Sequence, residues 1–220
     1  MFCSRTICVG GLPGVGSVGK IAADYLSNCL NCQPVKSFIS KGFPPQIMIN
    51  GSQVMLMQAD LKAARDDLFI LSGDAQPLEV REMYSLAGEI LEYLRSRNVS
   101  DIITLAAYVG DSSEKVVAAA TDRGLAEELE KEGISLLRNG AIGGINGLLV
   151  GLAPMYGLRG LCLLGTTSGE DLIDFRAAKD LLETVKIILG LEVDLNSLSI
   201  VEENGGEEIE PSDDFYISYR

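Results

Sequence analysis

Apolar residues recur at helical spacing in four stretches of the chain, with polar residues on the opposite side. In the first stretch, apolar side chains at positions 18, 21, 22, 25, 26 and 29 share one face, while Lys20, Asp24 and Asn28 form a polar face. Start and stop signals such as Gly190 mark the ends of the others. The predicted helices cover 18–29, the segment after Pro77 as far as Leu94, about 113–132 and about 169–189.

Short strand-like runs lie between these helices, and several of them are apolar throughout. Such runs are typical of strands that are covered on both faces by helices. The predicted strands are Thr6–Val9, Val35–Ile39, Leu68–Leu71, Ile102–Ala106 and Gly160–Leu164. The alternation of strands and helices indicates an α/β fold.

A hairpin is predicted in the same region, with Asn50-Gly51 as the turn between Ile47–Ile49 and Val54–Met57. Asn-Gly between apolar runs favours a two-residue turn because both central residues must accept a positive φ. A hairpin among buried strands predicts a mixed, mainly parallel sheet.

The end of the chain differs in composition from the rest. Residues 1–200 are predicted to form a single α/β domain, because 220 residues with 47% hydrophobic content suffice for a sizeable core. From Glu202 to Asp214, seven of thirteen residues are acidic, so we expect 201–214 to be a flexible tether. The aromatic cluster at 215–220 is then interpreted as a docking peptide.

The charge and the apolar pattern exclude several classes of protein. A formal net charge of -13 disfavours nucleic acid, which needs a basic surface, and anionic lipid. The uncharged run between Arg138 and Arg159 contains asparagine, proline and several glycines, so it predicts a buried loop and helix rather than a membrane span. With no signal peptide recognised, we expect a soluble cytoplasmic protein with reduced cysteines.

A glycine-rich segment at 10–20 follows the first strand and opens the first helix. Gly14, Gly16 and Gly19 fit the GxGxxG pattern of dinucleotide sites, and Gly14 to Lys20 fits most of a phosphate-binding loop. However, Ile21 stands where a phosphate-binding loop needs serine or threonine, and the second strand ends without an acidic residue. We therefore favour a tight strand-to-helix turn with close packing, with Lys20 on the polar face. Nucleotide binding through these residues, or an enzyme that uses them, is the alternative.

Other candidate chemistry is sparse. Cys29 and Cys32 form one CxxC pair, but zinc needs two further ligands and the chain has no histidine. Cys29 lies on the apolar stripe, so we expect a buried, metal-free thiol. Without histidine, Ser-His-Asp and Cys-His catalysis are excluded. Asp111 and Ser112 follow a strand and are expected to cap the third helix. No catalytic residue, cofactor or metal is predicted.

Four blocks together resemble the proteasome assembly chaperone family in its archaeal form. They are Gly11–Gly19, Gly143–Leu149, Leu163–Thr167 and Asp174–Ala178, and the resemblance covers about residues 7–198. It implies a three-layer fold similar to nucleoside phosphorylases and hydrolases but without their catalytic residues. It also implies a homo-oligomer.

Family members that act on proteasomes carry a C-terminal hydrophobic–Tyr–any signature, which inserts between α-subunits of the core particle. The chain ends in Ser218, Tyr219 and Arg220, so the tyrosine has the matching position and Arg220 supplies the carboxylate. Ser218 departs from the hydrophobic requirement, although Ile217 is adjacent. The resemblance thus predicts a non-enzymatic factor that docks on the proteasome α-ring. A paralogue with a silent tail and another protein partner is a further alternative.

Overall fold

The computed structural model describes residues 2, 5–110, 113–196 and 198. These residues form an eight-stranded sheet in the order β2-β5-β6-β1-β7-β10-β8-β9. The strands of this sheet are β1 (Ile7–Gly11), β2 (Gln33–Phe38), β5 (Ala59–Arg65), β6 (Leu68–Gly73), β7 (Asp101–Val109), β8 (Val116–Ala120), β9 (Ser135–Leu136) and β10 (Arg159–Thr167). A separate hairpin consists of β3 (Ile47–Asn50) and β4 (Gln53–Leu56). The helices are α1 (Val18–Cys29), α2 (Val80–Ser96), α3 (Arg123–Lys131), α4 (Gly144–Leu152) and α5 (Phe175–Leu189).

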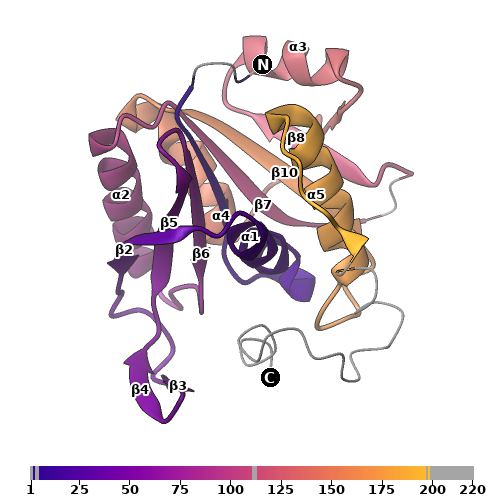
Figure 1. Cartoon of the computed structure of the whole chain (residues 1–220). Coiled ribbons are helices and arrows are strands. Elements are labelled where there is room, and N and C mark those ends of the chain that lie inside the picture. The colour runs from indigo at the N-terminus through magenta and orange to yellow at the C-terminus, as the bar shows by residue number, and fades with distance from the viewer. Residues whose placement is uncertain (1, 3–4, 111–112, 197, 199–220) are drawn as a thin grey trace.

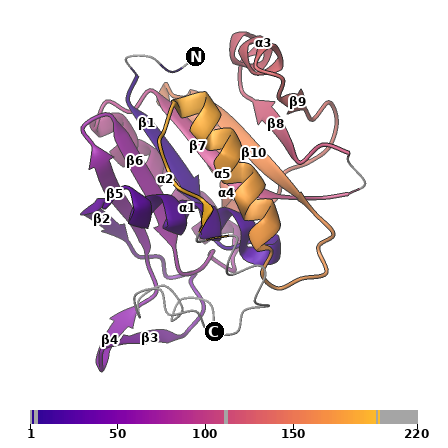
Figure 2. The same cartoon turned by 45° about the vertical axis from the view of Figure 1, so that its right-hand side comes forward.

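The central strands run parallel and carry helices on both faces. Strand β1 pairs in parallel with β6 and β7, and β7 pairs in parallel with β10. The outer strands β2, β5 and β8 pair in antiparallel fashion, so the sheet is mixed. Helices α1 and α5 cover one face, whereas α2 and α4 cover the other (Figures 1 and 2). The predicted three-layer α/β fold is confirmed.

The alternation along β1 shows why the buried strands are apolar throughout. Ile7 and Val9 belong to the core beneath α1 and α5, whereas Cys8 between them belongs to the core beneath α2 and α4. A strand with helices on both faces therefore favours apolar side chains at successive positions.

The first, second and fourth predicted helices correspond to α1, α2 and α5. The fourth begins later than expected, because Asp174 is its N-cap and its carboxylate accepts a hydrogen bond from the Ala177 backbone at 2.8 Å. It ends at Gly190, whose φ of 63° is in the left-handed region. Helix α4 lies within the uncharged run 139–158, as expected for a loop-and-helix segment. Within the described part of the chain, no helix has both the length and the apolar character to cross a bilayer.

The third predicted helix is wrong in its first half. Residues 116–120 form strand β8, which pairs with β10, and only Arg123–Lys131 are helical. Asp122 caps that helix by accepting a hydrogen bond from the Leu125 backbone at 2.9 Å. Asp111 and Ser112 lie outside the described residues, and the element that follows them is a strand, so the helix they were expected to cap does not begin there.

Two further differences concern the hairpin and strand β5. The hairpin turn is Gly51-Ser52 rather than Asn50-Gly51, because Asn50 pairs with Gln53 and the φ angles of Gly51 and Ser52 are 52° and 70°. Strand β5 was not predicted, since its charged residues interrupt the apolar run. Only alternate residues of β5 face the core, as is usual for a strand near the edge of an antiparallel sheet.

Candidate functional site

A cavity of about 540 Å³ lies at the carboxyl ends of β1, β7 and β10. In open α/β sheets, ligands usually bind at this edge. The lining residues come from the turn after β1, the end of β7 and the loop before α4. They are Leu12, Gly14, Val15, Gly19, Gln76, Ala106, Ala107, Tyr108, Val109, Leu137, Asn139, Gly140, Ala141, Ile142, Gly143, Gly144, Asn146 and Leu164.

The polar side chains of this cavity hold the surrounding loops together. The amide of Asn146 is buried, accepts a hydrogen bond from the Leu12 backbone at 3.1 Å and donates one to the Leu12 carbonyl at 3.0 Å. Gln76 donates to the Pro13 carbonyl and accepts from the Ile145 backbone. These two amides join the turn after β1 to the start of α4.

The cavity has no charged lining group among the residues that the structure describes. Glycine and alanine make up much of its wall, and Tyr108 is its one titratable side chain there. Its polar side chains are the Tyr108 hydroxyl and the amides of Gln76, Asn139 and Asn146.

The glycine-rich turn is shaped by backbone strain and close contact. Gly16 has a φ of 58°, and a Cβ there would lie 3.1 Å from the Cβ of Asp174. A Cβ at Gly19 would overlap the carbonyl oxygen of Leu105 on β7, and one at Gly11 would overlap the carbonyl oxygen of Gly19. These positions require glycine because helix α1 lies directly on the strands. The geometry supports the interpretation of the motif as a tight turn.

Lys20 lies beside Asp24 on the predicted polar face of α1, but at this position that face is covered rather than open to solvent. Only 6% of the residue is exposed, and its Nζ forms an ion pair with Asp24 at 2.5 Å. Asp74 lies near this pair; burial raises the pKa of its carboxyl group, while the charge of Lys20 lowers that pKa. Lys20 is also absent from the cavity lining. A phosphate-binding lysine would have to leave Asp24, so the geometry disfavours the nucleotide alternative.

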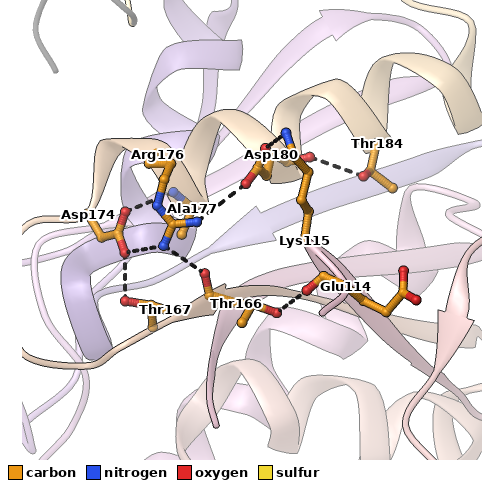
Figure 3. A network of polar contacts seen from close by, with 9 residues as sticks. All are labelled: Glu114, Lys115, Thr166, Thr167, Asp174, Arg176, Ala177, Asp180 and Thr184. Atoms are coloured by element: carbon orange, nitrogen blue, oxygen red, sulfur yellow. Dashed lines mark hydrogen bonds and ion pairs between the residues drawn. The ribbon is translucent and has the colours of Figure 1, made fainter. Parts of the chain in front are cut away.

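A polar network joins the end of β10 to the start of α5 (Figure 3). Asp174 accepts hydrogen bonds from the Ala177 backbone at 2.8 Å and from the hydroxyl of Thr167 at 2.6 Å. Arg176 lies 3.5 Å from the same carboxylate and donates to the Thr166 carbonyl at 3.2 Å. Thr166 and Thr167, at the end of β10, are thus part of a structural junction.

The network continues to a second buried carboxylate, Asp180. Its Oδ1 accepts a hydrogen bond from Lys115 at 2.8 Å, and its Oδ2 lies 3.7 Å from Arg176. The hydrogen bond to Asp180 raises the pKa of Lys115. Thr166 extends the junction by donating to the Glu114 carbonyl at 2.7 Å. Lys115 and Arg176 together offset the negative charges of the buried carboxylates Asp174 and Asp180.

The four blocks on which the family resemblance rests meet at this edge of the sheet. Leu12 bonds to Asn146, and the Gly16 carbonyl accepts from the Asp174 backbone at 2.8 Å. Thr167 bonds to Asp174. Segments that are far apart in the sequence therefore form one connected structural unit.

The cysteines differ from expectation in one respect. Cys29 is exposed rather than buried, because it is the last residue of α1 and lies beyond the apolar stripe, and Cys32 is half-buried. Cys8 and Cys162 are buried, and burial raises the pKa of Cys162 to about 11. No group of three or more histidine, cysteine, aspartate or glutamate side chains suited to a metal was found in the described ranges.

The residues predicted to dock on a partner lie outside the described residues. Ser218, Tyr219 and Arg220, the tether 201–214 and the rest of 215–220 belong to that part of the chain. Their role stays a prediction.

The hairpin β3–β4 carries a surface that the sequence interpretation missed. Its apolar hairpin face, formed by Ile47, Ile49, Val54 and Leu56, is largely exposed to solvent. The signal was present in the sequence as a lack of charge: no charged residue occurs between Lys41 and Asp60. An apolar run was taken as part of the buried sheet, although nothing in the run itself says what covers it.

Comparisons with known proteins agree with this architecture. The model of the PAC2 family matches residues 8–210. MJ1210 of Methanocaldococcus jannaschii is 31% identical over 201 residues, which are 88% of this chain and 78% of that protein.

Two solved structures from Pyrococcus furiosus are similar in both fold and sequence. PbaB, described as an archaeal proteasome activator, matches with a TM-score of 0.82 and 32% identity over 91% of this chain and 90% of its own. PbaA, described as an archaeal homolog of proteasome-assembly chaperone, matches with a TM-score of 0.82 and 29% identity over 92% and 85%.

Proposed function

The chain belongs to the PAC2 family, and from this we propose that it is a non-enzymatic factor that binds the proteasome core particle. In the proposed mechanism, the tail residues Ser218, Tyr219 and Arg220 dock on α-subunits of that particle or of its precursors. The site of action would be the cytoplasm, where thiols stay reduced.

The observation that carries this proposal is the likeness to PbaB and PbaA over nearly the whole of each chain. One of these proteins is described as a proteasome activator and the other as a homolog of an assembly chaperone. A likeness of sequence as well as fold supports a shared class of partner more strongly than fold alone.

The described cavity supports a role without catalysis. Its lining has no carboxylate, lysine or arginine in the described residues, and the whole chain has no histidine. Gly19 of the motif is accounted for by close packing of α1 on β7. Protein binding therefore explains the sequence with fewer assumptions than an enzymatic reaction.

The composition of the last twenty residues supports docking through the tail. Seven acidic residues between Glu202 and Asp214 favour an extended, hydrated tether, because like charges repel and little apolar surface is available to bury. Tyr219 combines an apolar ring with a polar tip, as interface anchors often do. The terminal carboxylate of Arg220 would add a charge-assisted contact with a basic group of the partner.

A homo-oligomer would make a weak tail effective. Ser218 replaces a hydrophobic residue, so we expect a single tail to bind weakly. Several tails on one assembly bind with a raised effective concentration once the first is in place. The proposal therefore includes self-association of the chain.

The test compares tail variants for binding to purified proteasome α-rings by surface plasmon resonance. Deletion of 218–220 and Tyr219→Ala should both abolish most of the binding, whereas the matched aromatic control Tyr216→Ala should keep it. Ser218→Leu should tighten binding by roughly 1–2 kcal/mol if the new side chain is fully buried. If the truncated protein binds as well as the full-length chain, docking through the tail is refuted.

A further inference from the structure

The apolar hairpin face is an exposed apolar feature that the proposed function does not use. The strand register sets Ile47 opposite Leu56 and Ile49 opposite Val54, so these four side chains share one side of the hairpin. Ile49 and Val54 are 62% and 66% exposed. Both views show the hairpin extending beyond the end of the main sheet (Figures 1 and 2).

The hairpin is poorly supported by the rest of the described chain. Among those residues, no other helix or strand packs extensively against β3 or β4. The opposite side carries Met48 and Met55, which are also only partly covered. A two-stranded hairpin is only marginally stable in water unless a helix or further strands cover it. Both the exposure and the isolation point to a cover supplied by another molecule.

The absence of charge indicates what that molecule is. Residues 42–59 contain no charged side chain, although 22% of the chain is charged. Each copy has a net charge of -13, so two copies repel one another wherever charged surfaces meet. A surface without charge is where two such copies can approach closely. A basic partner would instead be recognised by acidic side chains, which this surface does not offer.

We propose that the apolar hairpin face packs against a second copy of this chain and holds the homo-oligomer together. This inference deepens the proposed function, on which it rests, by naming the surface through which copies associate. An interface of stable size uses roughly 20–30 residues from each partner. The ten residues of the hairpin are too few, so the contact must include neighbouring surface.

The start of α2 provides that neighbouring surface. Leu78, Val80 and Tyr84 are all more than half exposed. The Leu78 backbone donates a hydrogen bond to the Gly42 carbonyl at 2.7 Å, which places this segment beside the loop that leads into the hairpin. The self-association surface therefore extends from the hairpin to the first turns of α2.

The test replaces the most exposed cross-strand pair with opposite charges. Ile49→Lys with Val54→Glu removes the apolar face but retains a favourable cross-strand pair, so the hairpin itself is kept. The matched control is Ile187→Lys with Leu172→Glu, which makes the same charge change at apolar residues that are at least as exposed, on α5 and in the loop before it. Light scattering at micromolar concentration gives the mass, and far-UV circular dichroism checks the fold.

We expect the wild type and the control to be oligomers and the hairpin variant to have the mass of one 23.5 kDa chain. A hairpin variant that keeps the wild-type mass, or a wild type that is already monomeric, overturns the inference. Binding to α-rings, measured on the same proteins, separates this result from the proposed function. Loss of multivalency should weaken binding of the monomeric variant at least tenfold without abolishing it. Tail deletion should abolish binding while the oligomer persists.

Discussion

Lys20 in helix α1 is only 6% exposed, whereas Ile49 in the hairpin β3–β4 is 62% exposed. The positive charge of Lys20 is balanced by the carboxylate of Asp24. Ile49 lies in a hairpin outside the main sheet, and no other described helix or strand packs extensively against that hairpin. In both cases burial depends on where the element lies in the fold. A buried charge then needs an opposite charge beside it, and an exposed apolar side chain is left without cover.

The largest expected effect would come from breaking the close packing of α1. Gly19→Val would drive a side chain into the Leu105 carbonyl, so we expect the free energy of unfolding to fall by about 3 kcal/mol or more. Gly16→Val should cost less, about 1–2 kcal/mol, because its main problem is the positive φ. Gly143→Val is the control, since no atom lies within 4 Å of its Cβ position and its φ of -85° is ordinary. Urea unfolding measures all three, and equal losses at Gly19 and Gly143 would contradict the packing argument.

A second effect sharpens the contrast at the buried charge. Lys20→Met leaves the Asp24 carboxylate without the lysine in a largely buried place, so we expect a loss of about 2 kcal/mol in urea unfolding. Adding Asp24→Asn should recover part of this loss, because the uncompensated charge is removed. A single variant as stable as the wild type would return Lys20 to the solvent-exposed role expected from the sequence.

A smaller effect concerns the buried thiol of Cys162 at alkaline pH. Burial raises its pKa in the folded protein to about 11 from 9.0, so the folded state holds this proton more tightly than the unfolded state does. The stabilising contribution is complete below pH 9 and is lost as the pH rises toward 11. By linkage, about 1 kcal/mol should be lost between pH 8 and pH 10. Urea unfolding of Cys162→Ala should show a shallower decline than the wild type, whereas Cys29→Ala, at an exposed position, should change the decline less.

The smallest effect is expected where the side chains are apolar but exposed. Ile49→Thr with Val54→Thr keeps β-branched residues in the hairpin, so the unfolding free energy of the isolated chain should change by no more than about 0.5 kcal/mol. Because self-association adds concentration-dependent stability, the measurement is a dilution series of urea titrations extrapolated to low concentration. A loss above about 1.5 kcal/mol in that limit would mean that the hairpin belongs to the core of a single copy.

Much of the fold followed from periodicity in the sequence. The stripe at 18–29 and the apolar runs at 68–71 and 102–106 correspond to α1, β6 and β7, because elements packed on both sides of a sheet must show a strong pattern. The structure of the segment 113–132 did not follow from periodicity. Its first half reads as helix or strand equally well in isolation, and pairing of β8 with β10 decided the outcome. Strand β5 escaped for the related reason that a strand next to the edge of the sheet can carry charge on one face.

The candidate site was predictable only in part. Glycine at positions 16 and 19 indicated a tight turn from the residue types alone, because no other residue accepts such φ angles and contacts equally well. The contact of Asp174 with Gly16 was invisible, since it joins segments more than 150 residues apart. No local pattern records such a meeting.

The sequence by itself determined the three-layer α/β class, the family resemblance and the identity of the positions that must be glycine, because these depend on local periodicity and backbone sterics. Only the tertiary structure decided which charged residue is buried and which apolar residues are exposed. The exposure of Lys20 and of Ile49 depends on which other elements pack against them, and the local sequence does not specify those elements. The pattern therefore located α1 and the polar face that carries Lys20, but not the cover over that face. It likewise located the hairpin, but not the exposure of its apolar face.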